Sequence, residues 1–175
     1  MHNFVMQMGL IYLFTGNGKG KTTSALGTAI RALGYGKKVA VIQFMKGWAT
    51  GEKRFFKAHG HEFYQFGRKE FVDFKNPSEE DKKLAEDGLK FAKEKLKERP
   101  FLIVLDELNV AIAANLVTIK EVLGLLNSIP EETNVIITGR YAKKELIDRA
   151  DLVTDMKEIK HPFQKGKSAV KGLDF

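Results

Sequence analysis

The sequence contains no cysteine. Disulfide bonds, thiolate nucleophiles and cysteine–metal sites are therefore excluded, and the chain has no thiol redox chemistry of its own. It also lacks any apolar run near the ~20 residues that a membrane-spanning helix needs, and its first residues lack the apolar core of a signal peptide. Its 43% hydrophobic and 29% charged residues, over 175 positions, are typical of a globular protein. We expect one domain, residues 1–175, with no membrane partner and a cytoplasmic location.

Acidic residues are scarce in one stretch of the chain. The formal charge is +7, from 29 Lys and Arg against 22 Asp and Glu. Between residues 19 and 57 the sequence has nine basic residues, and Glu52 is the one acid. Such a surplus suits an anionic partner, such as a nucleotide, a nucleic acid or an acidic small molecule, although a basic surface kept for solubility remains an alternative. Residues 79–99 mix both signs, as a solvated helix face does.

A glycine-rich stretch lies where an apolar run passes into a helical pattern. Residues 9–14 are apolar, residues 15–23 read TGNGKGKTT, and the next apolar residues recur with helical spacing. Strand, loop and helix in this order predict a P-loop, in which backbone N–H groups and the helix N-terminus hold phosphates. We expect Lys21 to supply a mobile cation and Thr22 a hydroxyl ligand for Mg²⁺. Thr15 stands where the general pattern G-x-x-x-x-G-K-[ST] begins with glycine, so the loop entrance is expected to differ.

Strand and helix patterns alternate along the chain. Further apolar runs of strand type span residues 39–44, 61–66, 101–107, 133–138 and 151–156. Helices are expected after Thr22, and from Ser78 and Thr118, each of which has an acid three residues on that can complete a capping box. This alternation predicts an α/β fold with a mostly parallel sheet and helices on both faces.

Charged residues follow two of these strands. Asp106 and Glu107 end an apolar strand, as the acids of a Walker B segment do, where they can reach a Mg²⁺ bound beside Thr22. Arg140 ends the next strand on the same edge, so it is placed to meet a phosphate or a second anionic ligand; pairing with a surface acid is the alternative. His161 has no companion at metal-ligand spacing, so a zinc site is not supported.

Aromatic residues crowd the middle of the chain. Those at strand positions are expected in the core. Trp48, Phe71 and Phe74 fall in expected loops, and they are the better candidates for the wall of a site that binds a flat ligand.

Taken together, these stretches resemble the P-loop ATP:cob(I)alamin (corrinoid) adenosyltransferases. The matching segments are TGNGKGKTTSALGTAIRALGYGKKVAVIQFMKG, GEKRFF, VLDELNVAI, NVIITGR and ADLVTDMKEIKHPFQKG, with an ending near GLDF. The resemblance runs from Gly9 to the C-terminus, and the shifted loop GNGKGKTT is the family's own form. It implies a P-loop NTPase (RecA-like) fold.

The resemblance also implies a reaction. Co(I) of a reduced corrinoid would attack the ribose 5′-carbon of ATP, take the 5′-deoxyadenosyl group and leave triphosphate, which needs no protein nucleophile. Mg²⁺ is the implied cofactor, ATP and the corrinoid are the substrates, a homodimer is the implied assembly, and an external donor such as a reduced flavoprotein would supply electrons. The family pattern does not say which corrinoid is preferred.

Residue roles carry over position by position. Lys21, Thr22 and Glu107 are the implied catalytic residues; Thr22 and Glu107 would hold Mg²⁺, with Asp106 as an alternative. The implied nucleotide-binding set is Gly16, Asn17, Gly18, Lys19, Gly20, Lys21, Thr22, Thr23, Arg31 and Arg140, in which Asn17 and Arg31 contact the nucleoside. Trp48, Phe71 and Phe74 would face the corrinoid, and aromatics near Phe71 would crowd the lower face of the cobalt. The chain departs from some members in having Asp73 where they carry tryptophan, and in having only eight residues before the first strand.

Two other functions compete with this one. An ordinary P-loop ATPase or kinase would use Glu107 or Asp106 to activate water or a hydroxyl, and it would release ADP. A nucleic-acid-dependent ATPase would fit the charge of +7, but no DNA- or RNA-binding motif accompanies it, and we expect no nucleic-acid partner.

Overall fold

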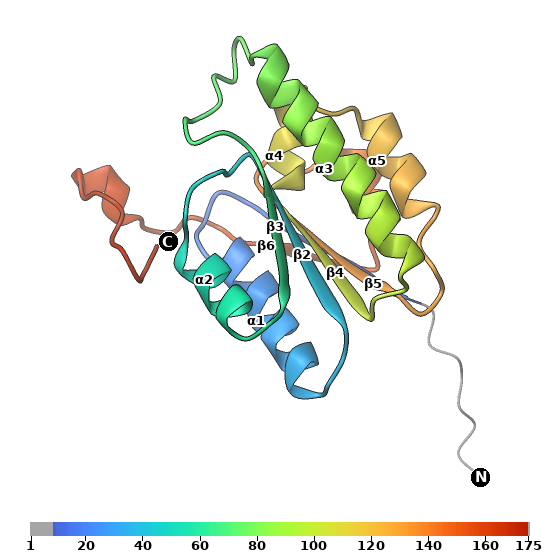
Figure 1. Ribbon diagram of the computed structural model, residues 1–175. Coiled ribbons are helices and arrows are strands. Elements are labelled where there is room, and N and C mark those ends of the chain that lie inside the picture. The colour runs from blue at the N-terminus through green and yellow to red at the C-terminus, as the bar shows by residue number, and fades with distance from the viewer. Residues whose placement is uncertain (1–8, 175) are drawn as a thin grey trace.

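The computed structural model describes residues 9–174, which form a parallel β-sheet flanked by helices (Figure 1). The strands are β1 (Ile11–Thr15), β2 (Val39–Phe44), β3 (Glu62–Phe66), β4 (Leu102–Asp106), β5 (Asn134–Thr138) and β6 (Leu152–Asp155). Their order in the sheet is β3-β2-β4-β5-β1-β6, and every neighbouring pair is parallel. The predicted parallel α/β sheet is thereby confirmed.

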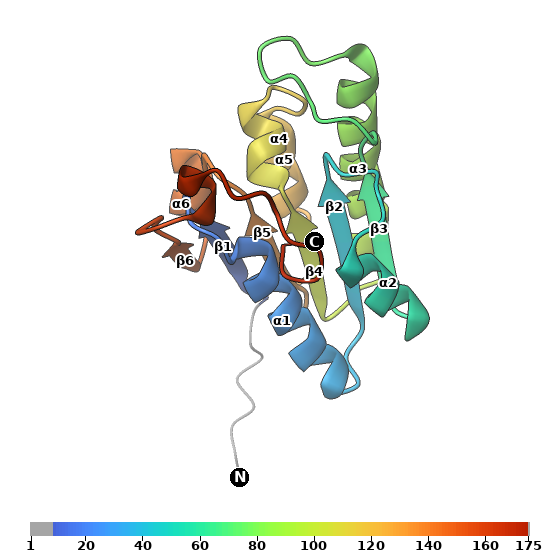
Figure 2. The same cartoon turned by 90° about the vertical axis from the view of Figure 1, so that its left-hand side faces the viewer.

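Helices cover both faces of this sheet, as Figures 1 and 2 show from two sides. One face carries α1 (Lys21–Gly34) and α2 (Gly51–Ala58). The other carries α3 (Glu79–Lys97), α4 (Leu108–Ala113), α5 (Ile119–Leu126) and α6 (Lys144–Arg149). A final 3-10 turn, η1, spans Pro162–Lys165.

Successive side chains of the buried strands point alternately to the two faces of the sheet. Along β2, Val39 and Val41 pack under α1 and α2, whereas Ala40, Ile42 and Phe44 pack against the helices of the opposite face. Successive strand residues point to opposite faces, so a parallel strand covered on both sides is apolar throughout. Gln43 breaks that rule, since it is fully buried and faces the α1 side by the same alternation.

The helix starts agree with the sequence signals. Ser78 caps α3 with Asp81, and Thr118 caps α5 with Glu121; each pair forms a reciprocal capping box. These bonds satisfy backbone N–H groups that the first turn of a helix leaves free. α1 ends at Gly34, and the predicted strand bounds hold to within two residues.

Three short helices, α2, α4 and α6, were not predicted. Each has six to eight residues, which is too few for an apolar period to be distinguished from a loop. Glu107 also lies outside the strand it was expected to end, because it is the N-cap of α4, with φ of 63°. Within residues 9–174, no helix combines the length and the hydropathy that crossing a bilayer requires.

Candidate active site

A cleft of about 860 Å³ opens at the carboxyl ends of the strands, where ligands bind in folds of this kind. Its walls come from the glycine-rich loop and α1, from the start of α2, from the ends of β4 and β5, and from the C-terminal segment. The residues that line it are Gly18, Lys19, Gly20, Lys21, Thr22, Thr23, Leu26, Gly27, Ile30, Lys46, Gly51, Glu52, Phe55, Phe56, Phe74, Glu107, Val110, Arg140, Tyr141, His161, Gly172, Leu173 and Asp174.

The glycine-rich loop packs against the chain that follows β6. A Cβ atom on Gly18 would lie 2.6 Å from the carbonyl oxygen of Lys157 and 2.7 Å from that of Met156, and one on Gly16 would also meet the backbone of Met156. The Gly18 N–H donates to the Met156 carbonyl at 2.6 Å. These two glycines are therefore required for close packing, and in this structure the Gly18 N–H faces a protein acceptor rather than the cleft.

Two lysines of the loop have different surroundings. The Lys21 ammonium donates to the carbonyls of Gly16 at 2.8 Å and Gly18 at 2.6 Å, and burial lowers its pKa. Lys19 is more exposed; its ammonium donates to the Leu173 carbonyl at 2.9 Å and pairs with the Asp174 carboxylate. The C-terminal segment thus places a carboxylate where an anionic ligand would meet Lys19.

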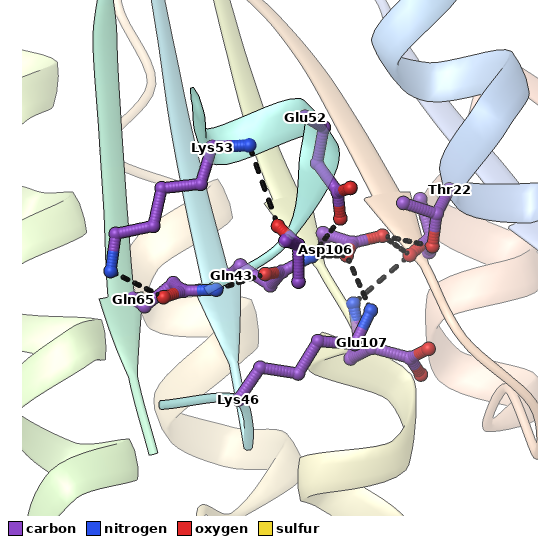
Figure 3. Close-up of polar contacts among 10 residues, drawn as sticks. Thr22, Gln43, Lys46, Glu52, Lys53, Gln65, Asp106 and Glu107 are labelled. Atoms are coloured by element: carbon purple, nitrogen blue, oxygen red, sulfur yellow. Dashed lines mark hydrogen bonds and ion pairs between the residues drawn. The ribbon is translucent and has the colours of Figure 1, made fainter. Parts of the chain in front are cut away.

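Asp106, which has no solvent exposure, is the centre of a hydrogen-bonded cluster (Figure 3). Its Oδ1 accepts from the Thr22 hydroxyl at 2.8 Å and from the Thr138 hydroxyl at 2.6 Å. Its Oδ2 accepts from the Gln43 amide at 2.7 Å, and the Lys46 ammonium lies 3.6 Å from the same oxygen. A buried carboxylate is stable only when it is compensated in this way.

Glu107 points into the cleft beside this cluster. Its N–H donates to the Thr138 hydroxyl at 2.9 Å, which fixes the backbone in the left-handed conformation. Burial raises the pKa of the Glu107 carboxyl, and the neighbouring Asp106 charge raises it further, whereas Lys46, Lys21 and Arg140 oppose the shift.

These residues fit a magnesium ion. The Thr22 hydroxyl donates a hydrogen bond to Asp106, so the lone pairs of its oxygen are free for a cation. Thr22 and Glu107 both line the cleft, and Mg²⁺ prefers such oxygen ligands alongside water and substrate phosphates. Asp106 is occupied by its donors, which suits it better to orienting Thr22 than to direct ligation.

The structure brings most of the predicted nucleotide-binding residues to the cleft, with Phe74 and Glu107 among its walls. Gly16 and Asn17 do not line it, and Arg31 is exposed near the far end of α1. Of the basic residues between 19 and 57, only Lys19, Lys21 and Lys46 line the cleft, and Lys37 and Lys38 border a separate hollow. The basic surplus is therefore spread over more than one surface.

Of the predicted aromatic wall, Phe71 and Phe74 lie in the loop between β3 and α3, which we call the aromatic loop, and Trp48 lies in the loop between β2 and α2. The rings of Trp48 and Phe71 are in edge contact, with their centroids 5.3 Å apart. Neither residue lines the cleft, and Phe71 is 86% exposed. At the base of the aromatic loop the Arg68 guanidinium donates to both oxygens of Asp81, at 2.8 and 3.0 Å. That bond holds the pKa of Asp81 below its usual range and anchors the loop to α3.

Sequence reasoning missed several residues of the site. Lys46 and Glu52 line the cleft, and Gln43 and Thr138 hold Asp106. The sequence did contain signals for two of these residues. Lys46 belongs to the basic run between residues 19 and 57, and Gln43 is an amide in the middle of a buried apolar strand, where it needs a polar partner.

The chain is similar in sequence to proteins of one family. The family model described as "ATP:corrinoid adenosyltransferase BtuR/CobO/CobP" matches residues 7–175. The corrinoid adenosyltransferase of Escherichia coli strain K12 is 40% identical over 171 residues, which cover 97% of this chain and 87% of that protein. The corrinoid adenosyltransferase CobA of Salmonella typhimurium is 40% identical over 172 residues, with the same coverage.

A solved structure shares the fold at low identity. The flagellar accessory protein FlaH from Methanocaldococcus jannaschii matches with a TM-score of 0.56 and 12% identity, covering 85% of this chain and 71% of that chain. At this identity the likeness concerns the fold alone, and it is consistent with the predicted RecA-like P-loop class.

Proposed function

The chain belongs to the ATP:corrinoid adenosyltransferase family, and from that membership we propose that it joins the 5′-carbon of ATP to the cobalt of a reduced corrinoid and releases triphosphate. The observation that carries the proposal is the family match over residues 7–175, which includes the whole of the cleft. ATP and a corrinoid are the family's substrates.

The proposed step is a displacement at carbon. Co(I) supplies an electron pair to the ribose 5′-carbon and becomes Co(III), a Co–C bond forms, and the C–O bond to the triphosphate breaks with its electrons passing to oxygen. The protein needs no nucleophile, and its work is to position ATP and to stabilise the leaving group.

The cleft has the charges that this work requires. Lys21 now donates to two loop carbonyls, so turning its ammonium toward a phosphate exchanges neutral acceptors for a negatively charged one. Lys19, Lys46 and Arg140 line the same space. These cations would oppose the negative charge that accumulates on the triphosphate as the C–O bond breaks.

We propose that Thr22 and Glu107 hold Mg²⁺, with Asp106 orienting Thr22 from behind. When bound, the ion would neutralise part of the phosphate charge. Catalytic roles for Lys21, Thr22 and Glu107 follow from this placement, because all three line the cleft.

Four further elements of the proposal come from the family and from the sequence. The reaction starts from Co(I), and a chain without cysteine needs an external electron donor, such as a reduced flavoprotein, to reach it. We propose that Phe71 and Phe74 face the corrinoid with Trp48 behind Phe71, since the two rings touch. A homodimer and a cytoplasmic location complete the proposal.

The test is an anaerobic assay of the purified protein with Mg-ATP and chemically reduced cob(I)alamin. We expect light-sensitive adenosylcobalamin and triphosphate to form in equal amounts. Release of ADP and phosphate without adenosylcobalamin would instead identify an ATPase or kinase on the same scaffold. A reaction without chemically reduced corrinoid serves as the control, because it should yield neither product.

A further inference from the structure

A row of polar side chains crosses the sheet beneath α2 and ends at Asp106 (Figure 3). Gln65 on β3 is in register with Gln43 on β2, and Gln43 is in register with Asp106 on β4. Residues in register on parallel strands point to the same face, so the three side chains form one line across neighbouring strands. Lys53, on α2, closes the line at its outer end.

The donors and acceptors of this row run in one direction. A lysine ammonium can only donate, so the bond of 2.6 Å from Lys53 occupies the oxygen of Gln65. The Gln65 amide nitrogen then donates to the Gln43 oxygen at 2.8 Å, which leaves the Gln43 nitrogen to donate to Asp106 Oδ2 at 2.7 Å. The lysine at one end, which only donates, and the carboxylate at the other, which only accepts, therefore select the same orientation of both amides.

Beyond Asp106, the hydrogen bonds of the row continue to the Thr22 hydroxyl. Because Gln43 occupies Oδ2, the other carboxylate oxygen of Asp106 is directed to Thr22 and Thr138. A rotation of the carboxylate would break several bonds together. The Thr22 hydroxyl is consequently held with its O–H donating to Asp106 and its lone pairs toward the cleft.

We propose that Lys53, Gln65 and Gln43 are positioning residues, which act through Asp106 to orient the Thr22 hydroxyl for the magnesium ion of Mg-ATP. This inference rests on the proposed function only for the identity of the bound Mg-ATP, and not on the corrinoid reaction. The row also links the N-terminal half of α2 to the metal side of the cleft, because Glu52, one residue before Lys53, lines the cleft.

A merely structural role is the competing explanation. Gln43 is fully buried, and any partner that satisfied its amide would stabilise the fold. The two explanations differ at Lys53, which is only partly buried and whose removal leaves the packing of Gln43 in place. They also differ in what magnesium adds to ATP binding, which a structural role would not change.

The experiment measures the dissociation constant of ATP by calorimetry, with Mg²⁺ and with EDTA. The ratio of the two constants is the gain that magnesium provides. The variants are Lys53→Met and Gln65→Leu, with Lys53→Arg as the conservative replacement and Lys57→Met, an exposed lysine of the same helix, as the matched control. Thermal unfolding is recorded for each.

We expect wild type, Lys53→Arg and Lys57→Met to share the same magnesium gain. Lys53→Met and Gln65→Leu should bind ATP in EDTA as the wild type does, within about twofold, while their magnesium gain falls about five- to tenfold, as the loss of one ordinary hydrogen bond predicts. An unchanged gain in both variants would overturn the proposal, as would a wild type whose ATP binding ignores Mg²⁺. Because no corrinoid is present, failure of the adenosyl transfer would leave this result intact.

Discussion

The two sides of the cleft are built differently. On the acid side, Asp106 has no exposure, and hydroxyls, an amide and an ammonium surround it. What we call the open side is the rim of the cleft toward the two ends of the sheet: the exposed Lys19 follows β1 and is held by the C-terminal segment, and the largely exposed Phe71 follows β3 and lies outside the cleft lining. The acid side is complete without a ligand, whereas the other side exposes cations and aromatic rings that a ligand would cover.

This difference suggests how binding energy is used. A preformed acid side costs nothing to organise when the nucleotide arrives, so it can fix the geometry of the phosphates. An open side can accept a bulky second substrate, and its side chains gain contacts only when that substrate binds. Whether a residue belongs to the preformed acid side or to the open side can be tested by substitution.

The largest effect is expected for Asp106→Ala. The change leaves three donors, two of them on buried residues, without their acceptor, and we expect a loss of about 3–5 kcal/mol in the free energy of unfolding. Urea denaturation measures it. Asp87→Ala, which removes a half-exposed acid paired within α3, is the control and should cost far less. A loss below about 1 kcal/mol for Asp106→Ala would contradict the idea of a preformed acid side.

Lys21→Ala should separate activity from stability. The Lys21 ammonium is close to where the phosphates are expected, so we expect turnover to fall about 100- to 1000-fold. Burial already disfavours its charged form, as the lowered pKa shows, so the fold should keep its stability to within about 1 kcal/mol. Turnover assays and urea denaturation test both points. Lys38→Ala, from the same basic run but outside the cleft, should leave turnover unchanged.

Asp81→Asn tests the base of the aromatic loop. The variant loses the bidentate bond with Arg68 and weakens the α3 cap, and we expect a cost of about 2 kcal/mol at pH 7. The Arg68 bond lowers the pKa of Asp81 in the folded protein. Its contribution is therefore present above the unfolded pKa of ~3.9 and is lost as pH falls through the folded value.

Thermal unfolding as a function of pH tests this dependence. The difference between wild type and Asp81→Asn should stay constant from neutral pH down to about pH 5 and shrink below about pH 4. A difference that grows on acidification would mean that the pair does not anchor the loop as a charged bond.

The sequence alone predicted the strands and the phosphate loop, because both depend on local pattern. Apolar runs mark buried strands, and glycines before Lys21 mark a turn around an anion. The short helices were missed since their burial comes from the sheet beneath them. All residues of α4 but the last are buried, although six residues show no usable period.

The polar row required knowledge of strand order. Gln43 and Gln65 are 22 residues apart, and nothing in the sequence says that β3 and β4 lie on either side of β2. The contact between Asp174 and Lys19 could not be predicted either, because the two residues are 155 positions apart in the sequence. The prediction of Arg31 as a nucleoside contact came from family resemblance, and the structure leaves that side chain exposed outside the cleft lining.

Phe71→Ala tests the open side. If Phe71 crowds the cobalt, the loss should appear when the reaction starts from Co(II) and not when Co(I) is supplied chemically. We expect a two- to tenfold decrease in rate, the factor that corresponds to an aromatic contact of about 0.5–1.5 kcal/mol. Phe163→Ala, which removes another exposed ring, should affect neither assay. Equal losses from both starting states would contradict the crowding role.

The smallest effect is expected for Asp174→Asn. Its pair with Lys19 is exposed, and exposed pairs contribute little, so the melting temperature should not change measurably. ATP phosphates must compete with this carboxylate for Lys19, and its removal should tighten ATP binding by about twofold at low salt and by less at high salt, where the attraction is screened. Calorimetry at two salt concentrations measures this, with Asp148→Asn, in an exposed pair on α6, as the control. A lower melting temperature or weaker ATP binding would assign the C-terminal segment to the preformed side, and the asymmetry of the cleft would then rest on the aromatic loop alone.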